Sequence, residues 1–162
     1  MSVKDFVQQR RDALIAMRRD FHMYPEPAWL EYRSAAKVAD RLISLGYDVA
    51  LGADVLDLDS RMGLPSDEVM KAAMDRAIEE GANLELVEKM GYGKTAIVAT
   101  MNFGGEGPVV AFRVDMDSND VIEAKEDSHV PTKEGFRSCH DKAMHACGHD
   151  AHMTMGLGLA CS

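Results

Sequence analysis

The chain has 162 residues, of which 46% are hydrophobic and 28% charged, and this composition is typical of one globular domain with its own core. Its formal net charge of −9 argues against nucleic acid or an anionic membrane as a partner. An odd number of cysteines, three, argues against a disulfide framework, and no apolar run resembles a signal peptide or a membrane span, so we expect a cytoplasmic protein.

Two amphipathic helices are predicted in the first third of the chain. The first covers residues 4–22, where apolar side chains recur on one face until Pro25 and Pro27 interrupt the pattern. His22 stands just before this break, and we interpret it as a capping or core-edge histidine. The second helix covers residues 33–45, and Gly46 follows it as a typical stop.

Residues 47–51 are then expected to form a short strand, and the segment that follows changes character. Ser66 is a good N-cap for a helix over 66–80, which Gly81 ends, and Asn83 is expected to cap a shorter helix reaching Met90. We interpret residues 54–91 as a helical insertion between two strands. A packing role for this insertion is favoured over that of a substrate lid.

A second pair of extended segments follows the insertion. Residues 95–101 and 108–114 are apolar, and a glycine-rich turn separates them, so the pattern predicts an antiparallel hairpin. Asp115 and Asp117 stand at its exit, where they fit either the rim of a site or ordinary turn chemistry. A long polar loop over 118–142 leads to a last helix at 149–160. The alternation of helices and strands predicts an α/β fold with α/β/α layering.

The motif Met-His-Ala-Cys-Gly-His-Asp-Ala-His over 144–152 carries the chemistry. Four of the six histidines and two of the three cysteines fall between Cys139 and His152. Thiolate and imidazole suit zinc and its transition-metal neighbours, and Cys147 and His149, which flank Gly148, can point to the same side. Asp150 or His152 would be a further ligand or would orient an imidazole.

Other interpretations of this motif stay open. The histidines are also compatible with capping or core positions, and Cys147 with a small buried apolar residue. A closed four-ligand site is a further alternative, although its spacing matches no recognised zinc motif. It would use Cys139, Cys147, His149 and His152.

The motif resembles the metal-binding motif of the amidohydrolase branch of the M20 metallopeptidase family, and the resemblance extends over the whole chain. Other segments narrow it to members that act on p-aminobenzoyl-glutamate. These segments are Arg18-Arg19-Asp20-Phe21-His22, Pro25-Glu26, Ser60-Arg61-Met62-Gly63-Leu64-Pro65, Phe112-Arg113-Val114-Asp115-Met116-Asp117, Ser128-His129-Val130-Pro131 and Gly135-Phe136-Arg137-Ser138-Cys139.

The resemblance implies a zinc-peptidase-like catalytic domain of three α/β/α layers, of which residues 1–162 would be the N-terminal half. It implies two ions of manganese or zinc in the full-length family, with Cys147 and His149 as metal ligands. Asp115 would support catalysis by orienting a ligand imidazole, while Cys139 and His145 would take no part. The general-base glutamate, the remaining ligands and the dimerisation domain would lie outside this chain.

The implied activity is hydrolysis of the amide of p-aminobenzoyl-glutamate, a folate breakdown product, to p-aminobenzoate and glutamate. We expect the 162-residue chain to be inactive by itself. A general N-acyl amino-acid amidohydrolase or carboxypeptidase is the first alternative, and a non-catalytic remnant is the second. The expected partners are a small N-acyl-glutamate substrate and a homologous second subunit or a second copy of the chain.

Overall fold

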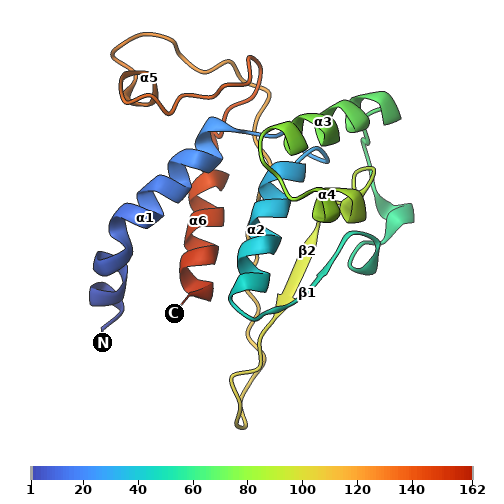
Figure 1. Cartoon of the computed structure of the whole chain (residues 1–162), viewed down its shortest axis with the longest axis vertical. Coiled ribbons are helices and arrows are strands. Elements are labelled where there is room, and N and C mark those ends of the chain that lie inside the picture. Colours follow the sequence, from blue (N-terminus) through green and yellow to red (C-terminus); the bar gives the residue numbers. More distant parts are fainter. Residues whose placement is uncertain (1, 162) are drawn as a thin grey trace.

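The computed structural model describes residues 2–161 and combines helices with one small sheet (Figure 1). In chain order the elements are α1 (Val3–Met23), α2 (Tyr32–Ser44), β1 (Asp48–Leu51), the 3-10 turns η1 (Gly52–Asp54) and η2 (Leu58–Ser60), α3 (Asp67–Glu79), α4 (Leu84–Met90), β2 (Ile97–Thr100), α5 (Val130–Lys133) and α6 (His149–Ala160). The mixed helix and strand composition, the four long helices and the strands near 47–51 and 95–101 are confirmed.

The caps predicted for the middle helices are also confirmed. The Ser66 hydroxyl accepts a hydrogen bond from the Val69 amide at the start of α3. The Asn83 side chain accepts one from the Glu85 amide at the start of α4. These side chains satisfy amide groups that have no partner within the first turn of a helix.

The sheet differs from the prediction. β1 pairs with β2 in antiparallel register, with Asp48 opposite Thr100 and Leu51 opposite Ile97. The predicted hairpin between 95–101 and 108–114 is wrong, because residues 108–114 form no strand. Val109 is 98% exposed and Phe112 70% exposed in this segment. Its apolar pattern predicts burial on both faces, but a strand also needs a neighbour to complete its hydrogen bonds, and within residues 2–161 none pairs with it.

α2 lies at the centre of the molecule and contacts α3, α4, α6 and both strands. One core cluster lies between α2, β1, α3 and α4, and includes Tyr32, Leu51 and Met90. A second cluster joins α1 to α6 through Phe21, Met153 and Leu157. Burying a side chain of this size contributes roughly 1.5–3 kcal/mol, so these clusters determine how the helices dock.

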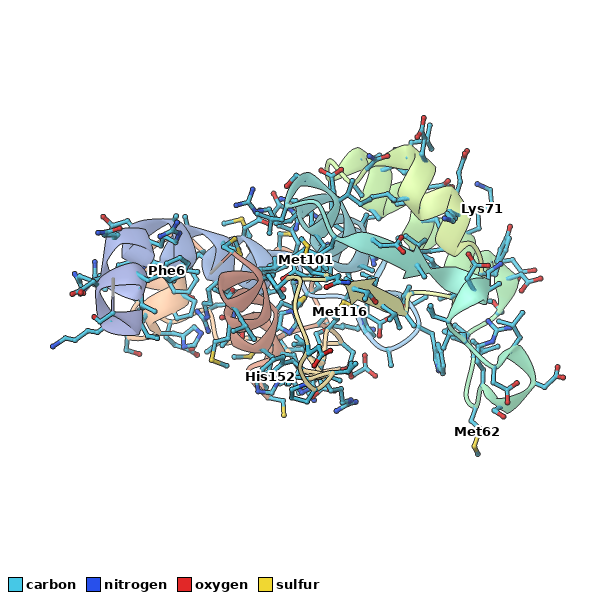
Figure 2. All side chains as sticks on the ribbon, turned by 90° about the horizontal axis from the view of Figure 1, so that it is seen from below. Phe6, Met62, Lys71, Met101, Met116 and His152 are labelled. Carbon is cyan, nitrogen blue, oxygen red and sulfur yellow. The ribbon has the colours of Figure 1, made fainter. Side chains whose placement is uncertain are left out.

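Met116 packs against both core clusters and thereby positions its neighbours in the chain. Figure 2 shows Met116 in the middle of the molecule and His152 at its edge, with Met62 at a far end. Asp115 and Asp117 flank this anchored residue, and their placement near α6 follows from it. Among the described residues, no helix has both the length and the apolar character needed to cross a membrane.

Candidate metal centre

The first turn of α6 and the segment around Met116 bring three metal-ligating side chains together. Asp115, His149 and His152 each offer one ligand atom, and these atoms all lie within 4.8 Å of one another. The Oδ2 atom of Asp115 is 3.9 Å from Nε2 of His149 and 3.7 Å from Nδ1 of His152. The two imidazoles stack with their centroids 5.2 Å apart, as expected for positions three residues apart on a helix.

Gly148 makes this arrangement accessible to the backbone. It precedes α6 with a φ of 88°, in the left-handed region that glycine adopts without steric cost. The chain can therefore turn sharply into the helix, so that His149 is the first helical residue. A side chain at position 148 would strain this turn and change the direction of His149.

The ring of His149 is held by Asp117. Its Nδ1 atom lies 2.8 Å from the backbone oxygen of Asp117 and 3.0 Å from its carboxylate. A carbonyl oxygen can only accept a hydrogen bond, so Nδ1 carries the proton and Nε2 keeps a lone pair on the side of Asp115. Histidines that bind metals are typically held in this way. The orienting contact, which the resemblance assigns to Asp115, is thus made by Asp117.

Cys147, the other predicted ligand, lies in the turn before α6. Its amide donates to the side-chain oxygen of Asn119 at 3.0 Å, and the residue is exposed. Its sulfur is not among the atoms that converge on Asp115. The structure therefore brings together His149, Asp115 and His152, which the sequence offered only as a further ligand, and the role of Cys147 stays a prediction.

Cys139 and His145 lie outside this group of ligand atoms. The Cys139 thiol donates to the backbone oxygen of Met23 at 3.0 Å, so the closed four-ligand alternative that includes Cys139 does not form. His145 is only 3% exposed, and neither of its ring nitrogens has a hydrogen-bond partner among the described residues. Burial lowers the pKa of His145 to about 4, so its ring is neutral.

A buried ion-pair network supports the first turn of α6 from below. Asp150 is completely buried, and its carboxylate lies 2.7 Å from Nδ1 of His22 and 3.0 Å from Nε of Arg18. On the other side, Nε2 of His22 lies 3.0 Å from the carboxylate of Glu123. Glu123 also contacts His129 at 2.8 Å, which connects the polar loop to the network.

The pKa values of this network favour its charged form. Burial by itself lowers the pKa of His22, but the hydrogen bonds to Asp150 and Glu123 raise it above its usual value. Burial raises the pKa of Asp150, whereas the hydrogen bond from His22 and the charge of Arg18 bring it below its usual value. His22 is thus a central buried cation, and the interpretation as a capping or core-edge histidine missed its partners, which lie 101 and 128 residues away.

Three ligands of this kind fit a divalent metal. One carboxylate and two imidazoles match the donor set of catalytic zinc sites, which use three protein ligands and keep one position open. The same donors also suit other transition metals. His149 is held in the tautomer that leaves Nε2 free, and this is the observation that best supports a metal here.

Comparison with known proteins places the chain among amide hydrolases. Indole-3-acetyl-aspartic acid hydrolase of Enterobacter agglomerans and one subunit of the p-aminobenzoyl-glutamate hydrolase of Escherichia coli are each 46% identical over 98% of this chain. Thermostable carboxypeptidase 1 of Saccharolobus solfataricus is 31% identical over 98% of the chain. No family model matches.

A solved structure gives the same result. The crystal structure of the aminobenzoyl-glutamate utilization protein from Klebsiella pneumoniae matches 99% of this chain with a TM-score of 0.77 and 39% identity. The chain spans 36% of the length of the two relatives at 46% identity and 34% of the crystallised chain. These comparisons confirm the resemblance found in the sequence.

Proposed function

We propose that this chain is the N-terminal part of the catalytic domain of a metal-dependent amidohydrolase of the M20 metallopeptidase family. The observation that carries the proposal is the convergence of Asp115, His149 and His152 in a chain 46% identical to two amide hydrolases. A three-layer α/β/α domain belongs to this proposal. So does the interpretation of residues 54–91 as an insertion, which is supported by α3 and α4 lying between the paired strands β1 and β2.

His149, His152 and Asp115 would hold a manganese or zinc ion, with Cys147 as a further ligand and with two ions in the full-length protein. A bound ion would polarise the amide carbonyl and lower the pKa of a water molecule. Asp117 keeps the His149 ring in the required tautomer. The His22 and Asp150 pair holds the turn that carries both imidazoles.

The names of the relatives suggest a substrate class. Both p-aminobenzoyl-glutamate and indole-3-acetyl-aspartic acid contain an amide between an aromatic acyl group and an acidic amino acid. We favour p-aminobenzoyl-glutamate, since a homologue from Haemophilus influenzae, 38% identical over 91% of the chain, is named for the same hydrolase. These relatives are described as one subunit of their hydrolase, which supports a homologous second subunit or a homodimer. A broader N-acyl amino-acid amidohydrolase is the alternative.

A chimera tests this proposal. The chain would replace the matching segment of the Escherichia coli p-aminobenzoyl-glutamate hydrolase, and release of p-aminobenzoate would be measured with added manganese or zinc. We expect hydrolysis that His149→Ala reduces by about 100-fold or more, since even outer-shell changes at metal sites cost 10- to 100-fold. Cys161→Ser, which alters a cysteine far from the centre in sequence, is the matched control.

Each other outcome has a defined meaning. Cleavage of indole-3-acetyl-aspartate without cleavage of p-aminobenzoyl-glutamate would favour the alternative substrate. Activity that survives both His149→Ala and a chelator would refute the metal assignment. A folded chimera that binds manganese but cleaves neither amide would identify the segment as a non-catalytic remnant.

A further inference from the structure

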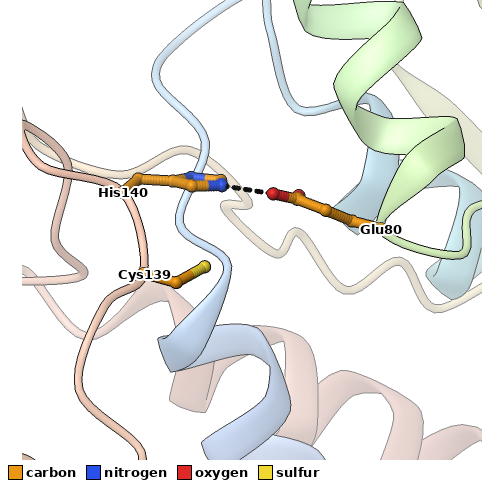
Figure 3. Close-up of side chains that lie close together, drawn as sticks. All are labelled: Glu80, Cys139 and His140. Atoms are coloured by element: carbon orange, nitrogen blue, oxygen red, sulfur yellow. Dashed lines mark hydrogen bonds and ion pairs between the residues drawn. The ribbon is translucent and has the colours of Figure 1, made fainter.

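A second group of ligand atoms lies outside the metal centre described above. Glu80 follows the C-terminal end of α3, while Cys139 and His140 lie in the loop between α5 and α6 (Figure 3). A carboxylate oxygen, a sulfur and an imidazole nitrogen from these residues lie within 4.8 Å of one another. The side chains of His140 and Glu80 are only 13% and 18% exposed, whereas Cys139 is exposed. The group is therefore largely buried but open to solvent on the cysteine side.

His140 has a hydrogen-bond acceptor at each ring nitrogen. Its Nδ1 lies 2.7 Å from the backbone oxygen of Pro25, and its Nε2 lies 2.7 Å from the Glu80 carboxylate. The carbonyl can only accept, so Nδ1 carries a proton. In the neutral ring, Nε2 would then direct a lone pair at the carboxylate, which is repulsive unless a cation lies between them. Either a second proton or a metal ion can play this part, and metal-bound histidines commonly donate their other N–H to a carbonyl.

Two further observations indicate a missing partner. The second carboxylate oxygen of Glu80 is buried and has no hydrogen-bond partner among the described residues. Buried polar atoms are normally satisfied, and a bound ion is one of the few explanations for an exception. Burial, and next the charge of Glu80, raise the pKa of the Cys139 thiol, which donates to the Met23 carbonyl instead of ionising. A metal ion would replace that proton and bind the thiolate.

We propose that Glu80, Cys139 and His140 form a second metal site, which takes zinc or a similar transition-metal ion. Sulfur and imidazole ligands favour such ions over magnesium or calcium, and one water would complete a tetrahedral set. Ligand atoms around tetrahedral zinc lie roughly 3.3 Å apart, so the Nε2 to Oε1 gap needs to widen by only a fraction of an ångström. The ion would tie the end of α3 to the loop that leads to His149.

This site shares no residue with Asp115, His149 and His152, so it does not depend on the proposed function. It can be tested in the unmodified chain, because its three cysteines are free and each can be followed by itself. The chain would be treated with a limiting alkylating agent, with and without zinc, and modification at each cysteine would be measured by peptide mass spectrometry. We expect zinc to slow alkylation of Cys139 by about tenfold or more, because the bound thiolate is shielded, and to leave Cys161 unchanged. Equal rates at Cys139 with and without saturating zinc would overturn the proposal.

Cobalt separates the two sites by spectroscopy. In a chain carrying Cys147→Ser and His149→Ala, we expect cobalt still to give a thiolate-to-metal charge-transfer band and the visible bands of a tetrahedral ion. Adding Cys139→Ser should remove the charge-transfer band, and Glu80→Gln, which keeps the shape of the side chain, should weaken cobalt affinity by roughly tenfold or more. Cys161→Ser is the control that should change nothing. No charge-transfer band in the first chain, or a band that persists after Cys139→Ser, would refute the site.

Discussion

His22 is charged inside the protein because a carboxylate faces each of its ring nitrogens. Asp150 and Glu123 both need a donor, so each nitrogen must carry a hydrogen, and the ring is an imidazolium. The charge of Arg18 completes the pairing of Asp150. Removing the imidazole would leave two buried carboxylates without their shared cation.

We predict that His22→Ala lowers the free energy of unfolding by about 3–5 kcal/mol at neutral pH, as is typical when one partner of a buried ion pair is removed. Urea unfolding followed by circular dichroism, in the presence of a chelator, would measure it. Lys71→Ala is a suitable control, since Lys71 forms an exposed pair with Asp75 and such pairs contribute little. A His22→Ala chain as stable as the unmodified chain would mean that the network does not hold α6 in place.

At the scale of an element, α2 obtains its N-terminal cap from outside the helix. Its N-cap residue, Glu31, makes no side-chain capping hydrogen bond. The carboxylate of Glu26, which is completely buried, accepts instead from the amides of Arg33 and Ser34 at 2.9 and 2.7 Å. The first turn of α2 is thus satisfied by the Pro-Glu segment before it, which accounts for the buried acid.

This buried acid predicts a pH dependence. Burial raises the pKa of Glu26 from 4.5 to about 7. Between these values the folded chain binds more protons than the unfolded chain, so the contribution of Glu26 to stability is full below pH 4.5 and is lost as the pH rises through about 7. The loss amounts to about 3 kcal/mol.

The measurement is the difference in unfolding free energy between the unmodified chain and Glu26→Gln across this pH interval. Other titrating groups contribute equally to both chains, so we expect the difference to fall as the pH rises. A difference that stays constant would show that Glu26 titrates at its ordinary pKa.

At the scale of the whole molecule, the candidate centre has three convergent protein ligands but no candidate general base of the expected kind. The resemblance implies a Glu-Glu pair beyond the metal motif, and no glutamate follows His149 in this sequence. A metal can be held by Asp115, His149 and His152, but proton transfer from water would lack its acceptor.

We therefore predict that the 162-residue chain alone does not cleave p-aminobenzoyl-glutamate, even with manganese or zinc bound. Release of p-aminobenzoate would be followed against a blank that contains only the metal, with intact p-aminobenzoyl-glutamate hydrolase as the positive control. Turnover above the blank that His149→Ala abolishes would contradict the prediction.

The amino-acid sequence alone determined the features that depend on near neighbours. The long helices follow from apolar periodicity, the starts of α3 and α4 from Ser66 and Asn83, and the metal chemistry from the residue types of one motif. These signals act within a turn or two of the chain, so no knowledge of packing is needed to interpret them. The resemblance also rests on short local segments.

Only the tertiary structure decided which distant residues meet. It paired β2 with β1 in place of 108–114, put Asp117 and not Asp115 against Nδ1 of His149, and enclosed His22 between two carboxylates. Each of these contacts joins segments tens of residues apart, and each depends on how α1, α2 and α6 dock through their shared cores. The two core clusters that meet at Met116 make those choices, because burying both at once leaves the chain around Asp115 a single way to pass.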